Sequence, residues 1–190
     1  MKPLLLSLVL LLFPLSENSN ALKVYQTNKA QSTMKILGTS TLHDWEMKAV
    51  DLKGSMDLTV GESSVEIKSL KLTVPVEALK SGKSAMDANA YKALKYKDHP
   101  NIKYQLMSVK EQKKLSNGNF SMVSRGKLTV AGETRILTVP IEVDASGEEV
   151  KVSGTTSFNM SSFDVEAPSF MMGAVTTGDN ITIKFSINYN

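Results

Sequence analysis

The chain has 190 residues, with 22 basic and 19 acidic side chains and a net charge of only +3 at pH 7. All but two of the basic residues are lysines spread along the chain, which argues against a nucleic-acid-binding surface because such surfaces favour arginine and clustered charge. Since there is no cysteine, both a disulfide framework and the lipid-modified cysteine of a bacterial lipoprotein are excluded.

The N-terminus has the pattern of an export signal. Lys2 precedes an apolar run at residues 4–13, and a polar stretch follows that ends in Ser-Asn-Ala at residue 21. The apolar run is shorter than the roughly 20 residues of a membrane-spanning helix, and small residues occupy the expected cleavage positions. We expect a signal peptide at residues 1–21 and one mature domain at residues 22–190 in the periplasm or outside the cell. An uncleaved anchor is the alternative.

Most of the remaining chain alternates apolar and polar residues, which predicts strands with one buried face. The clearest run is residues 181–189, and similar runs occupy residues 56–60, 70–74 and 137–143. Turn sequences separate these runs, as an antiparallel meander requires. They lie at residues 61–64, 117–118, 131–133 and 145–147.

The alternation changes phase between Ile67 and Leu70 and again between Leu106 and Met107, which predicts bulges or bends that curve a sheet. Glycines occupy apparent inward positions at residues 126 and 154. A missing side chain there either relieves crowding or makes room for something else.

One segment has a helical pattern instead. The sequence SAMD at residues 84–87 resembles a capping box, and apolar residues recur at helical spacing up to the stop at His99 and Pro100. Many antiparallel strands without alternating helices favour a barrel or a sandwich, and long bent strands favour the barrel. The predicted fold class is therefore all-β: an antiparallel β-barrel of about eight strands with one short helix.

Three segments resemble the YceI-like family of exported proteins. They are LTVPVEALKSGKSAMDANAYKALKYKDHPNIKYQL (residues 72–106), GKLTVAGETRILTVPIEV (residues 126–143) and TTSFNMSSFDV (residues 155–165) followed by a closing strand. The resemblance implies a lipocalin-like barrel with a helix over one side and a long apolar cavity. It also implies binding of a polyisoprenoid or quinone-like lipid, as a carrier or reservoir and not as an enzyme.

The candidate lipid-binding residues are apolar side chains in the inward phase of the strands and in the loop before the last strand. They are Met34, Ile36, Met56, Leu58, Phe120, Met122, Phe158, Met160, Phe163, Phe170, Met171 and Phe185. Methionine suits a pocket for a long flexible chain, although an ordinary core is the alternative use of each. The loop at residues 161–178 is either a mobile lid or a plain connection on the rim.

His43, Asp44 and the single tryptophan, Trp45, form the most unusual local cluster. One hypothesis is that Trp45 closes the barrel mouth while His43 or Asp44 meets a polar headgroup. The other is structural: Asp44 caps backbone amides at a bend and Trp45 plugs one end of the barrel.

Two other function classes remain open. Ser40, His43 and Asp44 offer the groups of a hydrolase, although hydrolase triads are assembled from separate segments and no nucleophile elbow is present. An adhesion module with a dry core is the third class. We expect no metal site and no cofactor other than the lipid. The expected partners are a hydrophobic small molecule or lipid and a transient membrane contact, without nucleic acid; the oligomeric state is open.

Overall fold

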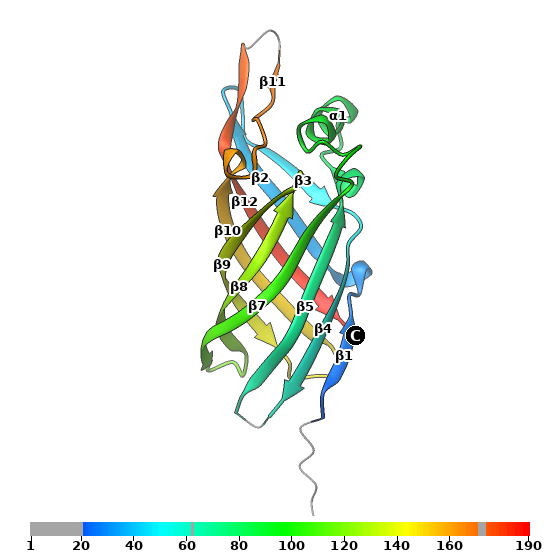
Figure 1. Ribbon diagram of the computed structural model, residues 1–190. Coiled ribbons are helices and arrows are strands. Elements are labelled where there is room, and N and C mark those ends of the chain that lie inside the picture. The colour runs from blue at the N-terminus through cyan, green and yellow to red at the C-terminus, as the bar shows by residue number, and fades with distance from the viewer. Residues whose placement is uncertain (1–20, 62, 171–173) are drawn as a thin grey trace, which may run out of the picture.

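The computed structural model describes residues 21–61, 63–170 and 174–190, without the side chain of Phe170. Within these ranges the chain forms a twelve-stranded antiparallel sheet that curls into a barrel (Figure 1). The predicted all-β antiparallel barrel with one short helix is confirmed. The predicted signal peptide lies outside the described residues, apart from Ala21.

Twelve strands are present in the described part of the chain where about eight were expected. The difference arises because β1, β6 and β11 have only four, two and two residues, which is too short to show alternation. The strands are β1 (Lys23–Gln26), β2 (Thr33–Ser40), β3 (Trp45–Ala49), β4 (Lys53–Val60), β5 (Val65–Pro75), β6 (Leu79–Lys80), β7 (Asn101–Lys114), β8 (Phe120–Val130), β9 (Glu133–Asp144), β10 (Val150–Asn159), β11 (Ser169–Phe170) and β12 (Val175–Tyr189).

The barrel closes through short strands at both edges of the sheet, whose order is β1-β4-β5-β7-β8-β9-β10-β12-β2-β3-β6. At the β1 edge, the backbone N–H of Gln26 donates to the carbonyl of Asn190 at 2.8 Å, and the N–H of Asn190 returns a bond to Gln26 at 2.9 Å. At the other edge, β6 follows β5 along the chain and pairs with β3. Main-chain hydrogen bonds therefore close the barrel at both edges. The strand β1 bonds to the residue after β12, and β6, which continues the chain from β5, bonds to β3.

Two bulges bend the wall where the alternation changes phase. In the β4–β5 pair, Asp57 and Leu58 oppose Ser69 and Ile67, which leaves Lys68 as the extra residue. In the β7–β8 pair the extra residue is Met107, which turns outward and is 45% exposed. Both predicted bulges are confirmed.

The two inward glycines relieve crowding. The ring of Tyr104 lies directly over Gly126, where a Cβ atom would collide with it. A Cβ on Gly154 would lie 2.7 Å from the ring of Phe185. Glycine at these positions therefore lets an aromatic ring from the neighbouring strand pack against the wall.

The predicted helix is present as α1 (Ser84–Ala93), but the capping-box interpretation is wrong. Ser84 already lies inside the helix, and Lys83 precedes it without a side-chain cap. The buried carboxylate of Asp87 instead accepts hydrogen bonds from the backbone N–H and the hydroxyl of Ser81, at 2.7 and 2.6 Å. Asp87 thus secures the turn that connects β6 to the helix.

A tyrosine fixes the other side of α1. The hydroxyl of Tyr91 lies within hydrogen-bond distance of the Glu77 and Leu79 carbonyls, at 3.0 and 2.9 Å, and accepts from the Lys80 ammonium at 2.7 Å. Together with Asp87, Tyr91 holds the helix at one end of the barrel, the same end as β11 (Figure 1). We call this the helix end, and the opposite end, with the β4–β5, β7–β8 and β9–β10 turns, the hairpin end.

Three short 3-10 segments connect strands in the described part of the chain, and two of them, η2 (Val76–Ala78) and η3 (Met160–Phe163), lie at the helix end. Residues 133–140 of β9, which precede Ile141, do not pair with β10, and η3 packs against β9. Phe163 from η3 is 1% exposed and forms a small cluster with Val130, Ala131 and Val165. The segment η2 (Val76–Ala78) leads from β5 into β6, and η1 (Lys29–Gln31) connects β1 to β2.

The main core occupies the hairpin end of the barrel. Inward side chains from several strands meet there and exclude solvent, with exposures of 0 to 5%. They include Met56, Leu58, Phe120, Met122 and Val143. This packed region forms a floor across the lumen.

The floor generates a prediction about stability. We expect Met56→Ala to lower the free energy of unfolding by about 2–5 kcal/mol, because truncation of a side chain in a closely packed core leaves a cavity. Chemical denaturation measures the change. Met107→Ala is the matched control, and an equal loss in both variants would contradict the placement of Met56 in a tightly packed floor.

A second prediction concerns the turn held by Asp87. Burial of Asp87 acts to raise the pKa of its carboxyl, but the two hydrogen bonds from Ser81 and the nearby Lys80 charge together lower the pKa below the ordinary value. We expect Asp87→Ala to cost about 1–3 kcal/mol of unfolding free energy at pH 7. Because the charged form is the stabilised one, the contribution is complete above about pH 4 and is lost as the pH falls through the lowered folded-state pKa.

Urea denaturation at pH 7 and at lower pH tests this dependence, with the exposed Asp98→Ala as control. A difference between wild type and Asp87→Ala that grows on acidification would contradict the assignment.

Candidate binding cavity

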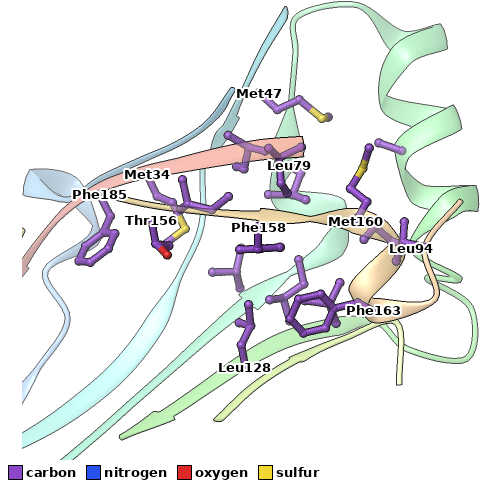
Figure 2. Close-up of a pocket in the computed structure, with 18 of the residues that line it drawn as sticks. Met34, Met47, Leu79, Leu94, Leu128, Thr156, Phe158, Met160, Phe163 and Phe185 are labelled. Carbon is purple, nitrogen blue, oxygen red and sulfur yellow. The ribbon is translucent and has the colours of Figure 1, made fainter. Parts of the chain in front are cut away.

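An apolar cavity of about 400 Å³ lies inside the barrel above the packed floor. Its wall extends from Tyr189 at the closed end to Ser40, His43 and Pro168 at the helix end. This volume falls in the range of small-molecule binding sites. Figure 2 shows side chains from several strands and from α1 converging on the space.

Alternation along the strands builds most of the wall. In β12 the inward residues Ile181, Ile183 and Phe185 line the cavity, and their partners in β10, Phe158 and Thr156, include an aromatic ring and a small polar side chain. The wall is therefore apolar because every second residue of these strands points into the barrel.

The helix α1 contributes the roof at the helix end. Met86, Ala90 and Ala93 of the helix and the C-cap residue Leu94 face the cavity, in agreement with their helical spacing in the sequence. Lys83 and Asn89 line the same region. The roof is thus apolar toward the lumen with polar groups beside it.

The structure brings six of the twelve candidate lipid-binding residues to the cavity wall. They come from β2, β10, η3 and β12, and they are Met34, Ile36, Phe158, Met160, Phe163 and Phe185. Several of these are visible in Figure 2. Phe163 touches the cavity while packing edge to face on Phe158, with ring centroids 5.1 Å apart.

Four other candidates lie in the floor and do not line the cavity. Met56, Leu58, Phe120 and Met122 point inward, as the alternation predicts, but they reach the lumen at the hairpin end, where the side chains fill it. Of the remaining two, Phe170 belongs to β11 but its side chain is outside the description, and Met171 lies outside the described residues.

The loop at residues 161–178 is partly built into the barrel. Ser161 donates hydrogen bonds to Asp179 through its backbone N–H at 2.8 Å and its hydroxyl at 2.5 Å. Phe163 and Val165 are buried, and β11 pairs with β12. The start of the loop therefore packs on the wall as a connection.

The corner formed by Trp45, His43 and Asp44 is held by main-chain contacts. The Trp45 indole donates to the Thr39 carbonyl at 3.0 Å and its ring covers Gly38. His43 Nδ1 lies 2.8 Å from the Asp44 carbonyl oxygen. Trp45 and His43 line the cavity mouth, whereas Asp44 is exposed and does not.

The capping role expected of Asp44 belongs to Ser40. The Ser40 hydroxyl oxygen accepts from the backbone N–H groups of Leu42 and His43, at 3.3 and 3.2 Å, and the hydroxyl donates to the His43 carbonyl at 2.8 Å. Ser40 can cap the bend because it precedes the two amides that need an acceptor. These bonds engage Ser40 with the backbone instead of with the His43 imidazole.

Three hydroxyl groups interrupt the apolar wall toward the closed end. Tyr104 donates to Ser124 Oγ at 3.3 Å, and Ser124 donates to the Val139 carbonyl at 3.0 Å. Tyr189 is 1% exposed. Burial, with the nearby Tyr104 phenol as a lesser cause, raises the pKa of Tyr189 well above the ordinary value of a phenol, so Tyr189 stays a hydrogen-bond donor.

Sequence reasoning missed part of the wall. Leu79 and Met47 line the cavity but come from strands too short to be assigned a face from the sequence, whereas Leu128 shares the inward phase of Phe120 and Met122 and was recognisable from it. Ile181 and Ile183 share the inward phase of Phe185 and were recognisable from that alternation. Within the described residues no cluster of three or more potential metal ligands occurs, and no helix is long and apolar enough to span a membrane.

Comparison with known proteins identifies a matching family and solved structures with the same fold. The YceI-like domain matches residues 25–189. The solved structure of Burkholderia cenocepacia BcnA is 17% identical and has a TM-score of 0.69, with coverage of 85% of this chain and 98% of that chain. The comparison with curated proteins found no match.

Two further solved structures share the fold. A polyisoprenoid binding domain from Saccharophagus degradans, implicated in plant cell wall breakdown, is 9% identical with a TM-score of 0.64, over 87% of this chain and 97% of that chain. A Campylobacter jejuni YceI protein is 19% identical with a TM-score of 0.52, over 71% and 79%. Since the domain match extends over almost all of the described residues, the protein belongs to the YceI-like family.

Proposed function

We propose that this protein is exported and binds a polyisoprenoid or quinone-like lipid in the barrel cavity, as a carrier or reservoir and not as an enzyme. The observation that carries the proposal is the apolar cavity itself, which the floor closes at the hairpin end and which reaches His43, Ser40 and Pro168 at the helix end. Such a space shields an apolar chain from water.

The energetics favour this class of ligand. Burial of an apolar chain contributes about 0.8 kcal/mol per methylene group, so a long tail supplies affinity without many polar contacts. Met34, Met47, Met86 and Met160 all face the cavity, and their flexible side chains can adapt to an irregular chain. A structural neighbour described as a polyisoprenoid binding domain supports the same class.

The alternatives have less support. A hydrolase would need Ser40 and His43 to act together, but the Ser40 hydroxyl bonds to the backbone and Asp44 lies away from the cavity. An adhesion module with a dry core gives no reason for an apolar space of about 400 Å³ inside the barrel. We therefore place the function inside the lumen.

Export is the part of the proposal that rests on the sequence. The basic, apolar and small-residue pattern at residues 1–21 predicts cleavage before Leu22. N-terminal sequencing of protein recovered outside the cytoplasm is expected to start at Leu22. Recovery with Met1 intact and bound to the membrane would favour the uncleaved anchor.

Filling the cavity should abolish lipid binding. Thr156 points into the cavity from β10 (Figure 2), whereas its neighbour Thr155 is exposed on the outer face. In a host that makes isoprenoid lipids, we expect wild type and Thr155→Trp to purify with a bound lipid and Thr156→Trp to lose it. Native mass spectrometry with solvent extraction provides the measurement.

Circular dichroism should show the same fold in both variants. Empty wild-type protein that also takes up no added isoprenoid lipid would contradict the proposal. Equal lipid content in Thr155→Trp and Thr156→Trp would place the bound lipid outside the cavity.

A further inference from the structure

The closed end of the cavity carries the phenol of Tyr189. Tyr189 is almost completely buried, and its hydroxyl makes no hydrogen bond with any of the described residues. Yet no fully buried side-chain nitrogen or oxygen atom in the described part of the chain lacks a partner. The Tyr189 hydroxyl therefore keeps some accessible surface, and that surface faces the cavity that Tyr189 lines.

The two neighbouring hydroxyl groups, of Tyr104 and Ser124, already donate their protons within the protein. Tyr104 donates its proton to Ser124, and Ser124 donates to the carbonyl of Val139. The Tyr104 oxygen can still accept a hydrogen bond from the lumen, while Tyr189 can donate one. The closed end thus offers a donor and an acceptor inside an otherwise apolar wall.

The two ends of the cavity differ in the charged side chains that line them. Among the described residues that line it, the basic side chains are Lys83 and His43, and both lie at the helix end. None of the described residues places a cation beside Tyr189 on the cavity wall. An anionic group placed there would lose its hydration without a counter-charge, which is costly, whereas a neutral oxygen needs only hydrogen bonds.

Resting on the function proposed above, we propose that the cavity binds a neutral, oxygen-terminated isoprenoid, an alcohol or a quinone, with its polar end inserted first. Tyr189 donates a hydrogen bond to the ligand oxygen, and the Tyr104 oxygen accepts from a ligand hydroxyl where one is present. The apolar tail then extends toward Met86 of α1 and Leu94 directly after it. His43 and Trp45 at the mouth would contact the tail and not the headgroup.

Three C20 probes test the inference: geranylgeraniol, geranylgeranyl diphosphate and the matching hydrocarbon. Wild type should bind the alcohol about three- to tenfold more tightly than the hydrocarbon, the effect of one neutral hydrogen bond. Tyr189→Phe should abolish that preference and leave hydrocarbon affinity unchanged. Tyr25→Phe, which removes a hydroxyl from a buried tyrosine away from the cavity wall, should keep it.

The outcomes separate the inference from the proposed function. Failure of all three probes to bind contradicts the proposed function itself. A hydrocarbon that binds, with an alcohol preference that survives in Tyr189→Phe, overturns only the deep polar site. Tightest binding of the diphosphate, lost in Lys83→Gln, also overturns it and places the headgroup at the mouth.

Fluorescence of the single tryptophan tests the orientation in the wild-type protein, even where a variant fails to fold. Trp45 lines the cavity mouth. A long-chain alcohol with a nitroxide at its tail end should quench Trp45 strongly, and one with the nitroxide beside the hydroxyl should quench it weakly. The reverse order would overturn the inserted orientation.

Discussion

The meeting of inward side chains at the hairpin end is the packing interaction on which the rest of the structure depends. Every second residue of each strand points into the barrel, so the lumen is filled wherever opposing side chains touch. Met56, Leu58 and Met122 touch and exclude solvent, and the same pattern nearer the helix end leaves a cavity. The floor supplies close packing, and therefore stability, while the space above it stays available for a ligand.

The helix end is held by polar contacts together with the small apolar cluster around Phe163. Asp87 and Tyr91 attach α1 to the β6 turn, and Ser40 caps the bend beside Trp45. These bonds fix the mouth without filling it. The cavity therefore has basic groups at its mouth and neutral hydroxyl groups at its closed end, a polarity that we connect with the direction in which a lipid enters.

Alternation in the sequence predicted the strands well, including the bulges at Lys68 and Met107, because a phase change is visible without any tertiary contact. It could not distinguish Met34 from Met56. Both occupy inward positions, but Met34 lines the cavity and Met56 lies in the floor. The position of an inward residue along the barrel axis decides whether it lines the cavity or fills the floor, and this position depends on strand tilt and register. Local capping was also misassigned at Asp87 and Asp44, where a nearby serine forms the decisive bonds.

By itself the sequence determined the fold class, the single helix and the inward faces of the long strands, because these follow from residue periodicity. Its family resemblance also agrees with the domain match over residues 25–189. Only the tertiary structure decided that η3 joins the wall, that Tyr104 and Tyr189 share the closed end, and that Asp44 stays outside the cavity. These features depend on contacts between strands far apart in the chain, which no local pattern records.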